Sequence, residues 1–312
     1  MAAVALAALA APAFAQAGRT VRLLALQPGG PSDLLARALA PGFAEALGES
    51  VVVENRGGAG GSIAAQMALR GEPDGRTLLV GGANNMVMAP LLSRSADYDP
   101  YRDFAVVSPL ATVPYALAAS PHLGVSDLAG LVAAVRAAKQ PLSAGSGGVG
   151  GSSHVAAELL FQRLAQPFLH VPYKGALLAM QEMVAGRIDL VATDLPVLLP
   201  LARDGKLRIV GVTGSQRSAL APDIRTLAEQ GLTGFRIEPW YALFCRAEAA
   251  RARVQALAAA VRRVGEDPAY LLQLQRIGFD LWNDSAQGVA ALMKLERERG
   301  QALLDNGVLR RD

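Results

Sequence analysis

Short apolar runs alternate along the chain with longer segments whose apolar residues recur every three to four positions. The short runs predict strands at residues 21–26, 51–54, 77–81, 106–110, 115–119, 142–144, 168–171, 188–192, 207–213 and 240–245. The periodic segments predict helices at residues 33–47, 63–70, 127–139, 153–164, 176–185, 247–265 and 285–304. Because strands and helices alternate, the pattern predicts an α/β fold with mostly parallel sheets.

The predicted strands fall into two series, which indicates two α/β lobes. We expect the chain to cross between the lobes near residues 116–121 and to return near residues 239–243. Both crossings are expected to be extended and able to flex as a hinge. This division assigns residues 16–117 and 240–312 to lobe I and residues 118–239 to lobe II.

The first 15 residues have the pattern of a secretory signal peptide. Residues 2–11 are almost purely Ala, Val and Leu, and Ala13-Phe14-Ala15 before Gln16 fits a small-x-small cleavage site. One feature is atypical, because no Lys or Arg precedes the apolar core. The alternative is an ordinary buried helix. We therefore expect residues 1–15 to be removed on export and the mature chain to be periplasmic.

Three glycine-rich turns each follow a predicted strand and precede a helical segment: Pro28-Gly29-Gly30, residues 55–61 and residues 145–151. The first turn of a helix exposes main-chain N–H groups at a positive dipole end, where an anion can bind without any basic side chain. Glycines at such positions also serve simply as turn formers, because they adopt positive φ without strain. Three such turns at one edge of a sheet favour a receptor for small anions.

Composition and net charge limit the classes of molecule that the protein is expected to bind. The net charge of +3 favours acidic small molecules over basic ones. Nucleic acid is not expected, because the aromatic content is only 5% and no basic cluster with interleaved aromatics is present. The single cysteine, Cys245, lies in an apolar strand-like run and is interpreted as a packing residue.

The sequence motifs that are typical of enzymes are absent or incomplete in this chain. Residues 145–150 satisfy G-x-G-x-x-G, but His170 and Val171 stand where a dinucleotide site needs an acidic residue. No P-loop and no G-x-S-x-G sequence is present, and His122, His154 and His170 lack metal-ligand spacing. We predict no catalytic residue, no metal and no cofactor. A site assembled only by the tertiary fold, and an enzyme using the same cleft, remain alternatives.

Several ordered motifs resemble one protein family. They are residues 28–33, 51–61, 74–79, 98–104 and 170–175, and the likeness continues through Leu195-Pro196 and residues 205–208 to Gly300. Together they resemble the tripartite tricarboxylate transporter substrate-binding proteins, which include the Bordetella uptake gene receptors. The resemblance covers essentially the whole mature chain.

The resemblance implies a periplasmic receptor with the type II periplasmic-binding-protein fold, whose two lobes close over a small carboxylate. Such receptors deliver their ligand to a membrane permease, or act as sensory receptors for a membrane kinase. A monomer is the natural expectation for a receptor that must close and dock. A few charge-assisted hydrogen bonds, at about 1.5–3 kcal/mol each, would offset the entropy cost of ordering the ligand and the lobes. The resulting dissociation constant is expected to be around micromolar.

The family's ligand-binding loops map onto five places in this sequence. The expected ligand-binding residues are Gln27, Pro28, Gly29, Gly30 and Ser32 in the first loop, Asn84 and Asn85 in the next turn, Ser146, Gly147, Gly148, Gly151 and Ser152 in the second lobe, and Tyr173, Thr193 and Asp194 at strand ends. Arg56 is expected to pair with a nearby acid, and Lys174 is expected to be solvated or to form an ion pair between the lobes. Trp240 and Tyr241 are expected to pack at the hinge.

Two departures from the family pattern bear on the ligand. Leu26 and Gln27 replace the aromatic residue and proline common in the family, so an aromatic contact is lost and an amide gained. Thr193-Asp194-Leu195-Pro196 replaces Asp-Asn-Leu-Pro, which displaces the carboxylate by one position. Adjacent strand residues face opposite ways, so the sequence leaves open whether Asp194 faces the cleft.

Overall fold

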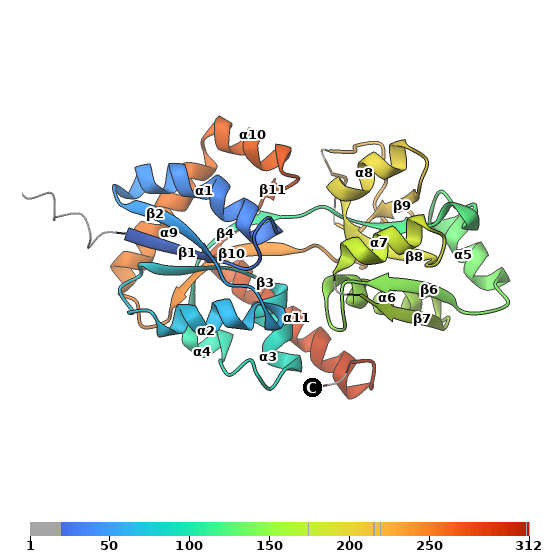
Figure 1. Ribbon diagram of the computed structural model, residues 1–312, viewed down its shortest axis with the longest axis horizontal. Helices are drawn as coiled ribbons and strands as arrows, with labels where there is room; N and C mark the ends of the chain where they lie inside the picture. The colour runs from blue at the N-terminus through green and yellow to red at the C-terminus, as the bar shows by residue number, and fades with distance from the viewer. Residues whose placement is uncertain (1–19, 174, 215, 219, 310, 312) are drawn as a thin grey trace, which may run out of the picture.

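The computed structural model describes residues 20–173, 175–214, 216–218, 220–309 and 311. It has two lobes, each built on its own sheet, joined by extended segments (Figure 1). The predicted two-lobe α/β fold is thus confirmed. The prediction of mostly parallel sheets is wrong, because the strands that flank the crossings between the lobes pair antiparallel with their neighbours in both sheets. The predicted signal peptide lies outside the described residues.

The first lobe contains a six-stranded mixed sheet in the order β11-β4-β10-β3-β1-β2. Its strands are β1 (Thr20–Ala25), β2 (Ser50–Asn55), β3 (Thr77–Gly82), β4 (Phe104–Thr112), β10 (Trp240–Arg246) and β11 (Asp280–Leu281). β1 runs parallel to β2 and β3, whereas β10 runs antiparallel to β3 and β4. The parallel strands bring the loops that follow β1 and β3 to one edge of the sheet, the edge where ligands bind in such folds.

The second lobe contains a five-stranded sheet in the order β7-β6-β8-β5-β9. Its strands are β5 (Tyr115–Ala119), β6 (Leu142–Ser146), β7 (Phe168–Pro172), β8 (Leu190–Asp194) and β9 (Arg208–Val212). β6 is parallel to β7 and β8, and β5 is antiparallel to β8 and β9. The carboxyl ends of β6 and β8 therefore lie at the same edge.

Helices cover both faces of each sheet (Figure 1). They are α1 (Pro31–Leu47), α2 (Ser62–Arg70), α3 (Ala89–Leu92), α4 (Pro100–Asp103), α5 (Leu128–Ala137), α6 (Ser152–Leu164), α7 (Ala176–Val184), α8 (Leu195–Arg203), α9 (Arg251–Gly265), α10 (Pro268–Arg276) and α11 (Ala286–Asp305). In the first lobe α1, α9 and α10 pack on one face and α2 and α11 on the other. In the second lobe α5 and α6 pack on one face and α7 and α8 on the other.

The chain crosses between the lobes twice. The first crossing is short, and the second is the longer segment between β9 and β10. β4 of the first sheet ends at Thr112 and β5 of the second begins at Tyr115, so the sheets change at Val113 and Pro114. The predicted boundary at 117/118 instead falls inside β5, which pairs throughout with strands of the second sheet. The N–H of Val113 donates to the main-chain oxygen of Pro239 (2.8 Å), which ties the two crossings together. Accordingly, we propose to set the lobe boundary at Pro114.

Two structural expectations concern single residues. Cys245 is fully buried in the core of the first lobe, where it packs with Val107 and Leu243. Arg56 contacts the carboxylate of Glu54, as expected for an ion pair.

Within the described part of the chain, none of the helices is both long and apolar enough to cross a bilayer.

Candidate functional site

The first-lobe loop is shaped by its own hydrogen bonds. The hydroxyl of Ser32, at the start of α1, accepts from the N–H of Leu26 (3.0 Å). The Asp33 carboxylate accepts from the N–H of Gly29 (2.8 Å), and the N–H of Gly30 donates to the Gln27 oxygen (3.1 Å). Gly29 has φ = +71°, a conformation that favours glycine. The N–H groups of both predicted glycines are therefore engaged within the loop.

The side chains of this loop differ in exposure. Gln27 and Pro28 are exposed, whereas Ser32 and Asp33 are buried. Gln27 lies against the next glycine turn, because a Cβ added at Gly57 would meet its Cγ at 3.2 Å. The side chain gained in this chain thus runs beside the second glycine turn while remaining exposed.

Asp33 was not among the predicted ligand-binding residues, yet it organises the loop. Burial would raise the pKa of its carboxyl, but hydrogen bonds from Arg37, the N–H of Gly29 and Asn55 together hold that pKa below its usual value. The Asp33 carboxylate is therefore ionised at neutral pH, and it accepts the hydrogen bonds that hold the loop in shape. The clue in the sequence was its place in the first helical turn.

The turn after β3 contributes an exposed amide and a buried amide. Asn84 is exposed and Asn85 is fully buried, and both begin a short π-helical turn, Asn84–Met88. Asn85 Oδ1 accepts from the N–H of Gly82 (2.9 Å), and its main-chain oxygen accepts from the Tyr98 hydroxyl. Its Nδ2 has no partner among the described residues. Asn85 therefore holds the turn in place, while Asn84 is available to solvent.

The second-lobe turn is also internally bonded. The N–H of Gly147 donates to Ser153 Oγ (2.9 Å), and the N–H of Gly148 donates to Ser146 Oγ (3.2 Å). The N–H of Gly151 donates to the main-chain oxygen of Gly148 (3.3 Å). These bonds occupy the donors that the glycine pattern predicted for an anion. The main-chain donors left at this place include those of the first turn of α6, which have no intrahelical partner and begin at Ser152.

A stacked pair of histidines lies beneath this turn. The rings of His154 and His170 are 3.8 Å apart and nearly parallel. His154 Nδ1 accepts from the N–H of Gly150 (3.0 Å), and His170 Nε2 is 2.7 Å from Ser146 Oγ. Burial, followed by the neighbouring His154, lowers the pKa of His170 to about 4. His170 is therefore neutral at pH 7 and positions the turn rather than a ligand.

The remaining predicted residues lie at strand ends. Tyr173 is half-buried and its N–H donates to the Ser146 oxygen (2.9 Å), which joins β7 to the turn after β6. Thr193 is buried. Asp194 pairs across the sheet with Tyr115 and keeps part of its surface accessible. Lys174 lies outside the described residues.

Turns from opposite lobes meet in one crevice of about 440 Å³. Its lining includes Gly60 and Asn84 from the first lobe and the turn from Gly147 to Gly151 of the second. The loop 27–32 is not part of this lining. The structure thus brings together two of the three glycine turns and one predicted asparagine.

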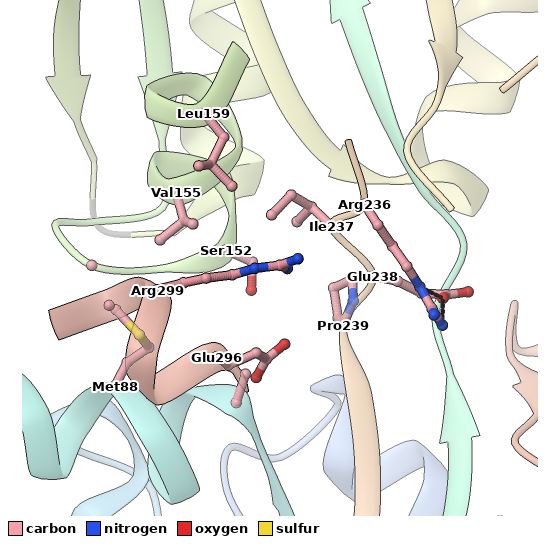
Figure 2. Close-up of a pocket in the computed structure, with 13 residues that line it drawn as sticks. Met88, Ser152, Val155, Leu159, Arg236, Ile237, Glu238, Pro239, Glu296 and Arg299 are labelled. Carbon is pink, nitrogen blue, oxygen red and sulfur yellow. Dashed lines mark hydrogen bonds and ion pairs between the residues drawn. The ribbon is translucent and has the colours of Figure 1, made fainter. Parts of the chain in front are cut away.

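A smaller pocket of about 60 Å³ adjoins the crevice, with Met88 and Gly150 in both linings. Arg299 extends from α11 across this pocket toward the crossing segment, below Ser152 (Figure 2). Glu296 Oε2 accepts from the Trp240 Nε1–H (2.9 Å), and burial raises the pKa of its carboxyl to about 7.

The lobes touch on either side of the cleft at glycines. A Cβ added at Gly150 of the second lobe would lie 2.2 Å from Leu92 Cδ1 of the first. A Cβ added at Gly278 of the first lobe would lie 2.3 Å from Pro196 Cγ of the second. Both glycines have positive φ. Glycine is therefore required at both positions for the lobes to approach this closely.

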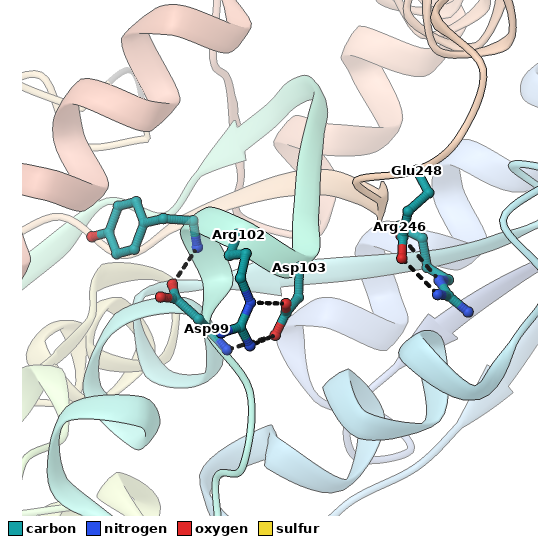
Figure 3. Close-up of polar contacts among 6 residues, drawn as sticks. Asp99, Arg102, Asp103, Arg246 and Glu248 are labelled. Carbon is teal, nitrogen blue, oxygen red and sulfur yellow. Dashed lines mark hydrogen bonds and ion pairs between the residues drawn. The ribbon is translucent and has the colours of Figure 1, made fainter.

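The motif at residues 98–104 has a structural role away from the crevice. The Asp99 carboxylate caps α4 by accepting from the N–H of Tyr101 (2.9 Å), and the Asp103 carboxylate binds Arg102 (2.7 Å) and the N–H of Asp99 (2.8 Å). Figure 3 shows this cluster with the neighbouring pair Arg246 and Glu248. These contacts fix the entry to β4.

Among the residues that the structure describes, no group of three or more His, Cys, Asp or Glu side chains is placed to hold a metal ion. The residues that sequence reasoning missed are those that support the turns: Asp33, Ser153 and His154. All three carried a local signal, since they stand in the first turn of a helix after a glycine run.

Comparison with known proteins gives a consistent set of similarities. Residues 35–308 match the model of the tripartite tricarboxylate transporter family receptor. The chain is 32% identical over 278 residues to a UPF0065 protein in the tcbD-tcbE intergenic region of Pseudomonas sp. strain P51, covering 89% of this chain and 82% of that protein.

Two solved structures are also similar. One is R. palustris Rpa4515 with adipate, with a TM-score of 0.81 and 27% identity, covering 95% of this chain and 99% of the other. The second is MatC from Rhodopseudomonas palustris with bound malate, with a TM-score of 0.75 and 29% identity, covering 91% of this chain and 98% of the other.

Proposed function

Because the chain belongs to the tripartite tricarboxylate transporter receptor family, we propose that it is a periplasmic receptor that binds a small organic carboxylate between its lobes. The observation that carries this proposal is the crevice shared by the first-lobe residues Gly60 and Asn84 and the second-lobe turn Gly147–Gly151. The similar proteins solved with adipate and malate support the ligand class. The receptor would pass its ligand to a membrane permease without changing it.

The first turn of α6 supplies the attraction for an anion. Its N-cap, Gly151, offers no side chain to the free N–H groups, so they and the positive helix end remain available. Asn84 can add a neutral donor from the opposite lobe. Binding would therefore draw the lobes together, because each contributes to one ligand.

The partner and the export route form part of the same proposal. We propose a tripartite tricarboxylate permease as the partner, a monomeric receptor, and removal of residues 1–15 during export. A chain mass beginning at Gln16 in protein recovered from the periplasm would support the export step. A sensor kinase that binds the liganded receptor would replace the permease in this scheme.

The ligand class is tested by isothermal titration of the mature chain with adipate, malate and monocarboxylates at pH 7.5. We expect at least one acid to bind with a dissociation constant around micromolar. Ligand at about 100 times that constant should add about 2.7 kcal/mol of stability, readable as a rise in Tm. The absence of heat and of any Tm shift with every acid would contradict the proposal, and turnover of a bound acid would favour an enzyme.

The location of the site is tested by a substitution that adds a negative charge while keeping the shape of the side chain. Asn84→Asp places a carboxylate in the crevice lining, and we expect carboxylate affinity to fall about tenfold, on the order of 1 kcal/mol of repulsion. The matched control is Asn283→Asp, an exposed position on a separate groove at the crossing. Equal loss in both variants would mean that only net charge matters and that the crevice is not the site.

A further inference from the structure

The pocket of about 60 Å³ beside the crevice is lined by both lobes. Its lining comes from places far apart in the sequence: the first turn of α6, the second half of α11 and the crossing segment before β10. Met88 and Gly150 line both the pocket and the crevice, so the two spaces adjoin. A ligand bound in the crevice would therefore lie next to the side chains of this pocket.

Close packing of α11 brings Arg299 to the pocket. A Cβ added at the next residue, Gly300, would lie 2.6 Å from Leu91 Cδ2, so a larger residue there would push α11 or Leu91 away. One turn earlier, Glu296 Oε2 accepts from Trp240 Nε1–H (2.9 Å), which ties the same helix to β10. Arg299 therefore extends across the pocket from a well-fixed part of the helix (Figure 2).

Within the described part of the chain, the guanidinium of Arg299 has no hydrogen-bond or ion-pair partner. The pocket lining contains two acids, and both have other partners. Glu238 pairs with Arg236 (2.9 Å), and Glu296 accepts from Trp240. A partly buried charge without a counter-charge is unfavourable. The pocket therefore offers a place for one negatively charged group.

The second lobe presents hydrogen-bond donors to the same pocket. Ser152 begins α6, and the N-cap before it, Gly151, has no side chain to accept from the N–H groups of the first turn. Arg299 lies below Ser152 (Figure 2). A guanidinium and the positive end of a helix repel each other when they share one pocket. A carboxylate placed between them would relieve this repulsion and accept from both.

Glu296 is the described acid that could compete for Arg299, because it stands one turn earlier on α11. Burial raises the pKa of its carboxyl to about 7, against smaller opposite effects of the Trp240 hydrogen bond and the charge of Arg299. The Glu296 carboxyl is therefore close to half protonated at pH 7 and does not fully neutralise the guanidinium.

We propose that Arg299 binds the carboxylate of the ligand directly, from the side opposite the first turn of α6. This inference rests on the proposed function and deepens it, because it adds a basic side chain to a site for which the glycine turns predicted main-chain donors. The planar guanidinium can donate two parallel N–H groups to one carboxylate. One carboxylate is then shared by a helix of each lobe, and Arg299 selects ionised acids over their neutral amides.

The test compares Arg299→Gln with the wild type by isothermal titration with adipate and malate at pH 7.5. Loss of the charge-assisted hydrogen bonds should raise the dissociation constant of the acid that binds by about 10- to 100-fold. Arg299→Lys keeps the charge but not the planar pair of donors, so its loss should be smaller than that of Arg299→Gln.

The matched control is Arg297→Gln, which removes the same charge from the same helix. Arg297 is exposed, lies over the Tyr101 ring (5.1 Å from its centre) and lines a separate groove. We expect this change to alter the dissociation constant by less than about threefold. An equal loss in both glutamine variants would overturn the proposal, because it would show an effect of net charge alone.

Stability without ligand separates binding from a structural role. Because no described residue pairs with Arg299, Arg299→Gln should leave the Tm of the ligand-free chain unchanged or slightly higher. A fixed concentration of the acid should then raise Tm by less than it does in the wild type. A lower Tm without ligand, together with an unchanged dissociation constant, would assign Arg299 to the fold and overturn the proposal.

The remaining results separate this inference from the proposed function. An unchanged dissociation constant in Arg299→Gln, or a larger loss in Arg299→Lys than in Arg299→Gln, would overturn the role of Arg299 and leave the carboxylate receptor intact. No binding of any acid by the wild type would count against the proposed function itself.

Discussion

At the scale of single residues, buried polar side chains shape the turns that the glycines permit. Asp33 accepts from the N–H of Gly29 and from Asn55 Nδ2 (2.9 Å), and its side chain pairs with Arg37 (2.9 Å). Ser153 and His154 do the same for Gly147 and Gly150 in the other lobe. The turns are therefore preorganised before any ligand arrives, which lowers the entropy cost of binding.

Asp33→Asn tests this role. The amide can replace only one of the two accepting oxygens, so a buried donor is left unpaired and we expect a loss of about 1–3 kcal/mol in unfolding free energy at pH 7. Because the folded-state pKa of Asp33 is lowered, its contribution is present above the unfolded value of 3.8 and disappears as pH falls through the folded value. Denaturant unfolding at pH 7 and pH 3 should show the difference shrinking in acid.

The control for that measurement is Asp97→Asn, an exposed carboxyl. It should change unfolding free energy by less than about 0.5 kcal/mol. An equal effect of both changes would mean that Asp33 contributes only through net charge.

At the scale of elements, the glycine turns serve the approach of the lobes as much as the ligand. Gly150 lies in a turn whose N–H groups are engaged, and its missing side chain leaves room for Leu92 on α3. The same arrangement recurs at Gly278, which faces Pro196 on α8. Glycine at these positions is explained by contact between lobes as well as by positive φ.

Gly150→Ala is expected to weaken ligand binding by about tenfold or more, since the added Cβ collides with Leu92 in the closed arrangement. Its control is Gly205→Ala, which has a similar φ of +70° but nothing within 4 Å of the added Cβ. Both should lose about 1–2 kcal/mol of stability from backbone strain.

Only the Gly150 variant should lose affinity, as measured by isothermal titration with malate or adipate. Adding Leu92→Ala should restore part of the loss. Unchanged affinity in Gly150→Ala would show that contact at this point is not needed for binding.

At the scale of the whole molecule, the structure has the lobes in contact on both sides of the cleft. The crossings between them are tied at Val113 and Pro239, and Trp240 is held by Glu296 of α11. Such an arrangement is suited to rotation of one lobe against the other about a short hinge. The contacts at Gly150 and Gly278 indicate a closed or nearly closed state.

Small-angle scattering tests closure. We expect the scattering curve of the chain with saturating ligand to fit this structure better than the curve without ligand, with a smaller radius of gyration. Gly278→Ala should diminish that change, because its Cβ would meet Pro196. Gly231→Ala, at an exposed turn with no atom within 4 Å of the Cβ, should not. Identical curves with and without a ligand shown to bind would contradict hinge closure.

The local pattern predicted most of the elements for a clear reason. Strands such as β3 and β5 are buried throughout and appear in the sequence as continuous apolar runs, and α1 and α11 show the helical period. The helix α8 was not predicted; its Pro196 stands in the first turn, where proline is compatible with a helix, and its Pro200 lies inside it. The strand β11 has two residues, too few for any periodic signal.

The sequence by itself determined the fold class, the family resemblance and the places where glycine turns follow strands, because these depend on local periodicity and on motifs that are contiguous in the chain. Only the tertiary structure decided which turns meet, which N–H groups are already engaged, and that Asp194 pairs across the sheet with Tyr115. Those facts depend on contacts between residues far apart in sequence, such as Asp194 with Tyr115. No local pattern of hydrophobic and polar residues encodes which turns of two lobes come together.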